Sequence, residues 1–232
     1  MTYIEVWKDI EKIATVAKPI LQIVGSSIQP EMKQFAERML VLSEKYPSIE
    51  GFANAIDKCA DIMGDILYVL GIEADAADII GYKMAHAEKS VSEFDTIEDY
   101  LSYLKNEVQI DITQYNALSE SEKLVYKIIG LSAQAAALGE KLDVIISADF
   151  TMLISNIVPL KEVEFKTEEI IDLIGKIKDA GIVRLDDICE YFSGEGETDR
   201  IRTGKIIKTI FEYIRPNEAD DLIERIKDFV RA

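Results

Sequence analysis

Residues Ile49 to Leu70 read IEGFANAIDKCADIMGDILYVL, and this stretch decides the fold class. It contains no proline, and its apolar residues recur at steps of three and four, which is the period of one helical face. Ser48 before it and Gly71 after it are typical helix boundaries. So broad an apolar face predicts a helix near the middle of a bundle. The apolar positions are Ile49, Phe52, Ala53, Ile56, Cys59, Ala60, Met63, Ile66, Leu67 and Leu70.

The rest of the chain has the same period. Only five prolines and 12 glycines punctuate 232 residues, and no pair of strands with a hairpin signal appears. We predict an all-α fold, an irregular multi-helix bundle of about ten helices with roughly 70% helix. Residues 1–72 are expected to form an N-terminal part that holds the central helix 49–70, and residues 73–232 an acidic helical part. The expected helices cover residues 3–24 (broken or kinked near Pro19), 30–45, 49–70, 75–88, 97–105, 119–142, 148–157, 167–180, 185–192, 199–214 and 217–230.

Two segments of the acidic part resemble each other, and they suggest a duplicated three-helix unit over residues 73–142 and 167–230. Gly81 aligns with Gly175, and Tyr103 aligns with Tyr191. Each copy of such a unit would bury its apolar face against the other. The alternative is that amphipathic helices with acidic first turns look alike.

Charge narrows the class of partner. The chain has 43 acidic and 26 basic residues, a net charge of −17, and residues 73–150 carry 15 acidic and six basic residues. This charge repels DNA, RNA and anionic membrane surfaces, so we predict no nucleic-acid partner and a protein partner with a basic surface.

The N-terminus has no basic leader before an apolar run, and no segment is apolar enough to span a membrane. Cys59 and Cys189 lie on apolar helical faces without a CxxC partner, so we expect two unpaired core thiols, with a disulfide between them as the alternative. These features favour a cytoplasmic protein without a cofactor. Export without a cleaved signal stays open.

The segment 88–111 interleaves aromatic and acidic residues, which can form a surface for a basic partner. The alternative is that its aromatic rings point into the core. Reversal of Glu98 and Asp99 to lysine is expected to weaken the complex and to leave the melting temperature close to that of wild type, because exposed substitutions usually change stability little. The candidate partner-binding residues are Glu93, Asp95, Glu98, Asp99, Tyr100 and Tyr103.

No catalytic constellation emerges from the sequence. Asp57, Asp61 and Asp65 share one helical stripe and are weak metal candidates, but carboxylate bundles add a Glu-x-x-His pair and Lys83 precedes His86 at that spacing. We therefore expect no metal site. The aspartate row is expected to be a solvated acidic face or to form salt bridges to lysines of a neighbouring helix, and His86 is expected near the carbonyls of a helix end.

The stretch from Gly194 to Lys205 imitates a phosphate-binding loop but lacks its first glycine and its Ser or Thr. What remains is a basic cluster of Arg200, Arg202, Lys205 and Lys208. We expect this cluster to dock internally against the acidic residues 73–150, with an external acidic partner as the alternative.

Three functions survive. The first is a non-catalytic protein-interaction module of a bacterial-type cytoplasm, an inhibitor or immunity-type protein that binds a basic partner. The second is a helical effector or adaptor, exported without a cleaved signal, whose residues 1–45 dock to a partner or a membrane. The third is a metal-dependent enzyme that uses the aspartate row.

Overall fold

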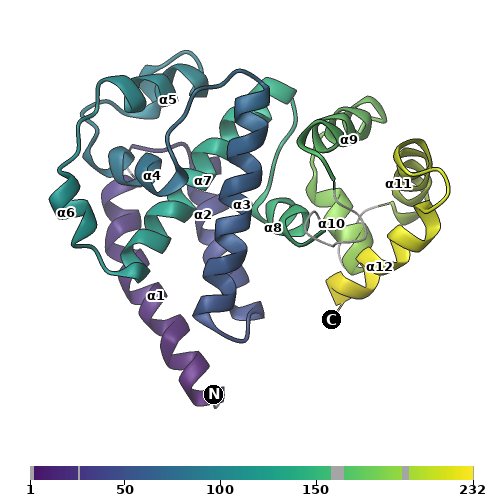
Figure 1. The fold of residues 1–232 in the computed structure, drawn as a ribbon, viewed down its shortest axis with the longest axis horizontal. Coiled ribbons are helices and arrows are strands. Elements are labelled where there is room, and N and C mark those ends of the chain that lie inside the picture. Colours follow the sequence, from purple (N-terminus) through teal and green to yellow (C-terminus); the bar gives the residue numbers. More distant parts are fainter. Residues whose placement is uncertain (1–2, 26, 158–164, 195–198, 232) are drawn as a thin grey trace.

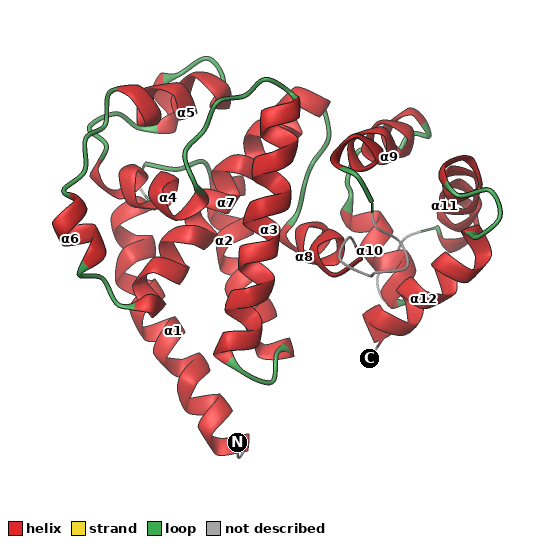
Figure 2. Cartoon of the chain, viewed as in Figure 1, coloured by secondary structure: helices red, strands yellow, loops and turns green. Residues whose placement is uncertain are grey.

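The chain forms an all-α bundle, which confirms the predicted fold class. The computed structural model describes residues 3–25, 27–157, 165–194 and 199–231, and no strand occurs in these ranges (Figures 1 and 2). Most of the described residues are helical. Two short 3-10 helices, η1 (Ser43–Lys45) and η2 (Val91–Glu93), join the α-helices. The α-helices are α1 (Tyr3–Val24), α2 (Pro30–Leu42), α3 (Ile49–Val69), α4 (Ala77–His86), α5 (Ile97–Asn106), α6 (Ile112–Asn116), α7 (Glu120–Leu142), α8 (Ala148–Ile157), α9 (Thr167–Asp179), α10 (Asp186–Ser193), α11 (Arg200–Ile214) and α12 (Ala219–Arg231).

The most enclosed helix is α7, and α1, α2, α3, α4 and α5 all pack against it. Every residue from Ile128 to Ala135 is buried, so this part of α7 has no solvent-facing side. A helix buried all round must be surrounded by other helices. The helix predicted over residues 49–70 does pack on several others, α1, α7, α8 and α9, but the most enclosed position belongs to α7.

The boundaries and the buried face of α3 agree with the sequence. Ser48 Oγ accepts a hydrogen bond of 3.0 Å from Gly51 N, which confirms the N-cap. Gly71 has a φ of 77°, the left-handed conformation that lets the chain leave the helix end. The apolar side of α3 contacts α7, α8 and α9, and its opposite side faces solvent.

The chain after α7 forms a second group of helices, on the right in Figure 1. Within it, α12 packs on α10 and α11, and α11 also packs on α9. The connection to the first group is made by α8, which contacts α2, α3 and α10, and by α9, which contacts α3. Two backbone hydrogen bonds, from Ile145 N to Val183 O (2.8 Å) and from Leu185 N to Ile145 O (3.2 Å), tie the start of this group together.

The predicted boundary at residue 72 does not separate two cores. Because α7 packs against α1, α2 and α3, residues 1–72 share their core with residues 73–142. In the ribbon, helices up to α7 gather on one side and the later helices on the other, so the visible division follows α7 (Figure 1).

Two local features differ from the predicted elements. The helix α1 continues through Pro19 without a break, because Ile13, Ala17, Ile20 and Val24 on both sides of the proline are all buried against the bundle. The short helix α6 was missed, although Asp111 caps it by accepting hydrogen bonds from Thr113 N and Gln114 N. Its five residues are too few for an apolar period to show.

The proposed duplication stays a prediction, and one of its aligned pairs differs in environment. A Cβ atom on Gly81 would overlap the backbone of α7, whereas a Cβ on Gly175 would meet nothing within 4 Å. The shared glycine therefore has a packing role only in the first segment.

Candidate interaction site

The aromatic residues of the acidic segment lie in the core. Tyr100 is 0% exposed and Tyr103 is 8% exposed, and their rings stack with centroids 6.2 Å apart. Lys89 covers the ring of Tyr103 from outside, at 5.0 Å from the centroid. The prediction that Tyr100 and Tyr103 contribute to a partner-binding surface is therefore wrong, because buried rings offer no contact area to a partner.

Most carboxylates that were predicted to bind a partner instead form hydrogen bonds or ion pairs within the protein. Glu93 accepts a hydrogen bond of 2.7 Å from Ser90 N at the start of η2. Asp99 accepts one of 2.7 Å from the Thr96 hydroxyl at the N-terminus of α5. Glu98 pairs with Lys141 of α7 at 3.1 Å. Asp95 is exposed, and no hydrogen bond or ion pair to it occurs within the described ranges. Helix capping thus explains part of the acidic excess.

The aspartate row lies on the solvent side of α3, as expected. Asp57, Asp61 and Asp65 are all exposed, and Asp57 forms an ion pair with Lys127 of α7. Within the parts of the chain that the structure describes, no group of three His, Cys, Asp or Glu side chains is placed to hold a metal ion. Sequence reasoning missed Tyr68, which continues the row one turn later and is 83% exposed.

His86, Cys59 and Cys189 are the remaining candidates for a chemical role, and their contacts are structural. His86 Nδ1 lies 2.8 Å from the carbonyl oxygen of Tyr82, so the ring donates to its own helix as predicted. Both cysteines are unpaired, which excludes the alternative disulfide. Burial raises the pKa of the Cys59 thiol to about 12, so this sulfur stays protonated and is a poor nucleophile.

The basic cluster does not dock against the acidic residues 73–150. The helix α11 packs on α9, α10 and α12, which lie away from α5 (Figure 1). Its charges find local partners: Lys208 pairs with Asp220 at 2.7 Å, and Arg200 donates to the Gly194 carbonyl. Asp199 accepts a hydrogen bond of 3.0 Å from Arg202 N, so this residue caps a helix where a phosphate loop would have glycine.

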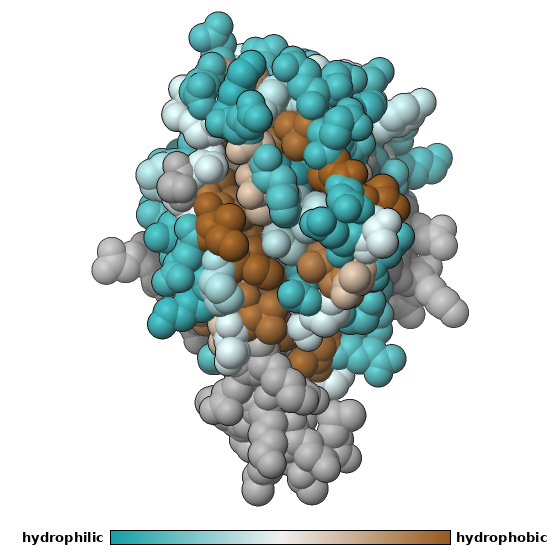
Figure 3. All heavy atoms as spheres, turned by 90° about the vertical axis from the view of Figure 1, so that its left-hand side faces the viewer, coloured by the Kyte–Doolittle hydropathy of each residue, from teal (hydrophilic) through white to brown (hydrophobic). Residues whose placement is uncertain are grey.

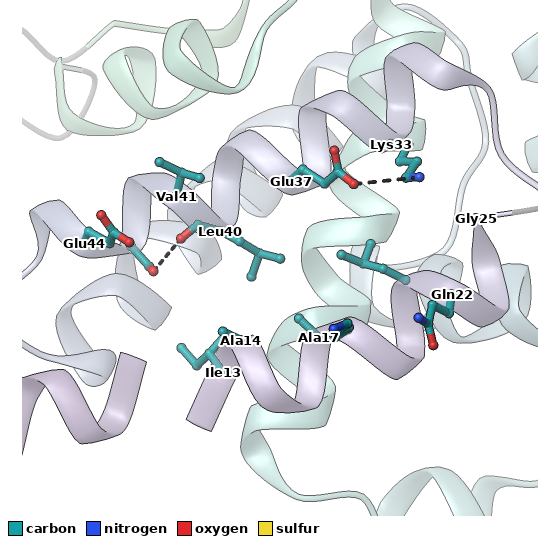
Figure 4. Close-up of a pocket in the computed structure, with 13 residues that line it drawn as sticks. Ile13, Ala14, Ala17, Gln22, Gly25, Lys33, Glu37, Leu40, Val41 and Glu44 are labelled. Atoms are coloured by element: carbon teal, nitrogen blue, oxygen red, sulfur yellow. Dashed lines mark hydrogen bonds and ion pairs between the residues drawn. The ribbon is translucent and has the colours of Figure 1, made fainter. Parts of the chain in front are cut away.

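A groove of about 520 Å³ lies between α1 and α2. Figure 4 shows α2 along one wall and α1 along the other, with the side chain of Leu40 in the space between them. Five residues on each wall have the same spacing, i, i+4, i+7, i+8 and i+11, which is one stripe along a helix, and Ile13, Ala17 and Ser43 also line the groove. The stripes are Ala14, Lys18, Leu21 and Gln22 on α1, continued by Gly25 just after it, and Lys33, Glu37, Leu40, Val41 and Glu44 from α2 into η1.

Both helices turn a buried stripe toward the bundle. This stripe includes Ile13 and Ala17 on α1, which also line the groove, and Met32 and Ala36 on α2, and each of these lies one residue before an exposed groove position. Both helices pack on α7, which lies behind the groove. Small residues on α1, Ala14 and Gly25 among them, leave the space open. The paired spacing is the signal that sequence reasoning could have used.

Apolar residues are also exposed outside the groove. The face in Figure 3, which carries α1, α4 and α6, shows apolar patches interrupted by polar residues. Ile23 of α1 is 58% exposed and Ile112 of α6 is 55% exposed. Single exposed apolar residues are common on protein surfaces, whereas a hollow with apolar walls on two helices is a typical site for a partner side chain or helix.

No helix in the described ranges is long and apolar enough to cross a membrane. No family model, no curated protein and no solved structure matches the chain.

Proposed function

We propose that this protein is a non-catalytic interaction module that binds an amphipathic helix of a partner protein in the groove between α1 and α2. The single observation that supports this function is the groove itself. Its walls hold the partly exposed side chains of Leu21, Leu40 and Val41. A helix that lays its apolar face into a hydrophobic groove is a recurring mode of recognition.

The apolar walls supply the driving force. Each Å² of apolar surface that leaves water contributes about 25 cal/mol, and a helix along the groove covers both walls at once. Val41 is 51% exposed, so a bound helix can remove much of the apolar surface of this side chain from water. Two helix faces also define a direction, which gives the site shape selectivity beyond that of a flat patch.

The partner helix is proposed to be basic on its polar side. The net charge of −17 steers cations toward the protein and raises the association rate more than the affinity. Glu37 and Glu44 stand along one wall of the groove. An inhibitor or immunity-type protein that masks a basic partner is the form of interaction that fits this charge.

The second candidate function, an adaptor whose residues 1–45 dock to a partner, uses the same site. Every groove residue lies between Ile13 and Glu44. The two functions differ in location, since the first acts in the cytoplasm and the second after export, and both require binding in this groove. The third candidate, a metal-dependent enzyme, has no geometric support in the described residues, because the aspartates point to solvent and Asp57 is paired with Lys127.

Selection from a displayed peptide library tests the proposal. The library consists of helical peptides of about 14 residues, with leucine at every third or fourth position and the other positions randomised. Peptides are selected on the wild-type protein and then measured against Ala14→Glu and Val41→Glu, which place a charge on each wall. Both residues are exposed, so the fold should tolerate the changes.

The matched control is Val183→Glu, because Val183 is 48% exposed and lies outside the groove, between α9 and α10. Selected peptides are expected to carry excess Lys and Arg, to lose at least tenfold in affinity for both groove variants, and to bind the control like wild type. Equal binding to all four proteins, or the selection of no peptide, would overturn the proposal. Between about 50 and about 500 mM salt, the association rate should fall steeply.

A further inference from the structure

One half of the α1–α2 groove is apolar. Figure 4 shows Ile13, Ala14 and Ala17 of α1 in the same half of the groove as Leu40 and Val41 of α2. Ile13 and Ala17 are buried against the bundle, whereas Ala14 and Val41 are exposed and Leu40 is partly exposed. This apolar half therefore offers exposed apolar surface on a well-packed base.

The polar residues that border the apolar half do not oppose an apolar side chain. Ser43 is buried, and its hydroxyl donates a hydrogen bond of 2.5 Å to the Leu40 carbonyl oxygen, so it needs no partner from outside. Lys18 and Glu44 are exposed. Their charged groups can stay in water while an apolar side chain enters between the helices.

The other half of the groove is polar. Gln22 lines it from α1, and Lys33 and Glu37 line it from α2, with 3.9 Å between their charged groups (Figure 4). Their side chains are 49% and 54% exposed, so both charges are hydrated. An apolar side chain above this pair would remove water from two charges without replacing its hydrogen bonds, which is costly. The polar half therefore disfavours apolar residues of a partner.

We infer that the bound partner helix places its large apolar side chains in the apolar half and turns polar side chains toward the polar half. From Ile13 to Ala17 the apolar half extends about 6 Å along α1, which is about one helical turn. It accepts one large apolar side chain, or two that lie one turn apart at positions i and i+3 or i+4.

This inference rests on the proposed function and narrows the class of partner. The partner is a helix whose contact face is apolar over a single turn rather than along its whole length. Its apolar side chains act as anchors and supply most of the affinity, because the residues that dominate binding gather in well-packed pockets from which water is excluded.

A glutamine scan of the peptide tests this asymmetry. Each leucine of the tightest peptide from the selection is replaced in turn by glutamine, which has a similar helix propensity, and binding to the full-length protein is measured. One leucine, or two that lie one turn apart, should lose at least about tenfold in affinity, and the others less than about twofold. Large losses at leucines further apart than one turn, or at none, would overturn the inference.

Matched glutamates on the protein locate the anchors within the groove. Ala14→Glu and Gln22→Glu each add one negative charge at an exposed position of α1, the first in the apolar half and the second about two turns away in the polar half. Ala14→Glu should weaken the peptide by at least about fivefold more than Gln22→Glu does. Equal losses, or a larger loss in Gln22→Glu, would overturn the inference.

A double-mutant cycle tests the contact itself. Replacement of the anchor leucine by glutamine should cost at least about threefold less in Leu40→Ala than in wild type, because the two side chains are in contact. The matched variant Glu37→Ala, in the polar half, should leave that cost unchanged. Circular dichroism shows whether Leu40→Ala is folded, and Val41→Ala, at an exposed position, takes its place if it is not. Equal costs in all the proteins would contradict the proposed contact.

The outcomes separate the two proposals. Loss of binding in Ala14→Glu and Val41→Glu together with an equal loss in Gln22→Glu leaves the function standing and rejects the inference. If no peptide depends on the groove, both fall.

Discussion

Gly81 of α4 and Gly130 of α7 meet backbone to backbone. A Cβ atom on Gly81 would overlap the carbonyl group of Tyr126 and lie 3.0 Å from Gly130 N, and a Cβ on Gly130 would overlap the carbonyl group of Ala77. The two glycines therefore allow an approach that no other residue permits. This contact brings α4 onto the most enclosed helix of the bundle, and α5 packs on both.

Replacement of either glycine by alanine is expected to be strongly destabilising. Gly81→Ala and Gly130→Ala each force two rigid backbones apart, so the free energy of unfolding should fall by about 3 kcal/mol or more. Chemical denaturation followed by circular dichroism measures this change.

Matched controls come from glycines within other helices. A Cβ on Gly64 of α3 or Gly175 of α9 would meet nothing within 4 Å. Alanine has the higher helix propensity, so Gly64→Ala and Gly175→Ala should stabilise by up to about 1 kcal/mol. Destabilisation by all four variants alike would show that the close contact of α4 and α7 is not the cause.

Charge reversal at the start of α5 should lower stability. Glu98→Lys/Asp99→Lys removes the ion pair with Lys141 and the hydrogen bond with Thr96, and places two cations at the positive end of a helix. The free energy of unfolding should fall by about 1 to 2 kcal/mol. This predicted loss of stability replaces the expectation of a melting temperature close to wild type, which assumed that Glu98 and Asp99 make no contacts within the protein.

Asp95→Lys is the control for this reversal. Asp95 is exposed and precedes the N-cap of α5, so its replacement should change stability by no more than about 0.5 kcal/mol. Thermal melts of the three proteins decide the matter, and equal melting temperatures would mean that the contacts of Glu98 and Asp99 are not stabilising.

Glu169 should make stability depend on acid pH. The hydrogen bond from Lys166 N and the ion pair with Arg215 lower the pKa of this carboxyl below its usual value of 4.5. A lowered pKa in the folded state contributes stability above the unfolded pKa, and that contribution disappears as pH falls through the folded pKa. Wild type should therefore melt above Glu169→Gln at pH 7, and the gap should close toward about pH 3. A gap that is constant with pH would contradict this assignment.

The aspartate row should show no specific affinity for divalent cations. Asp61 and Asp65 are exposed and no third carboxylate converges on them in the described ranges, whereas calcium needs six to eight oxygen ligands. Calorimetric titration with magnesium, calcium, manganese and zinc should give only weak, non-saturating heats. Stoichiometric binding that disappears in Asp61→Asn would bring the enzyme hypothesis to the front.

Local sequence signals were enough for most helices. Ser48, Thr96 and Ser119 precede the helices that they cap, and each accepts the hydrogen bond that its position implies. These interactions span three residues, so a single sequence contains all the groups involved. The same holds for the exposed aspartates of α3, whose stripe follows from the helical period alone.

The sites depended on contacts that the helical period does not specify. An amphipathic pattern says that Tyr100 and Tyr103 share a face with Leu104, but a face rich in aromatic residues suits a core and a binding surface equally well. Burial of Tyr100 at 0% exposure follows from the arrival of Phe94 and the neighbouring helices. The groove could likewise not be predicted from the sequence, because its two walls are separate helices and their distance is set by packing on α7.

By itself, the sequence determined the helical class, the places where helices begin and end, the net charge and the absence of a CxxC pair, since each depends on neighbouring residues or on composition. Only the tertiary structure decided that α7, rather than residues 49–70, is enclosed, that the carboxylates of α5 cap and pair within the chain, and that α1 and α2 leave a groove. The physical reason is that these features arise from packing between segments far apart in sequence. At Gly81 and Gly130, the absence of two side chains decides which helices can meet.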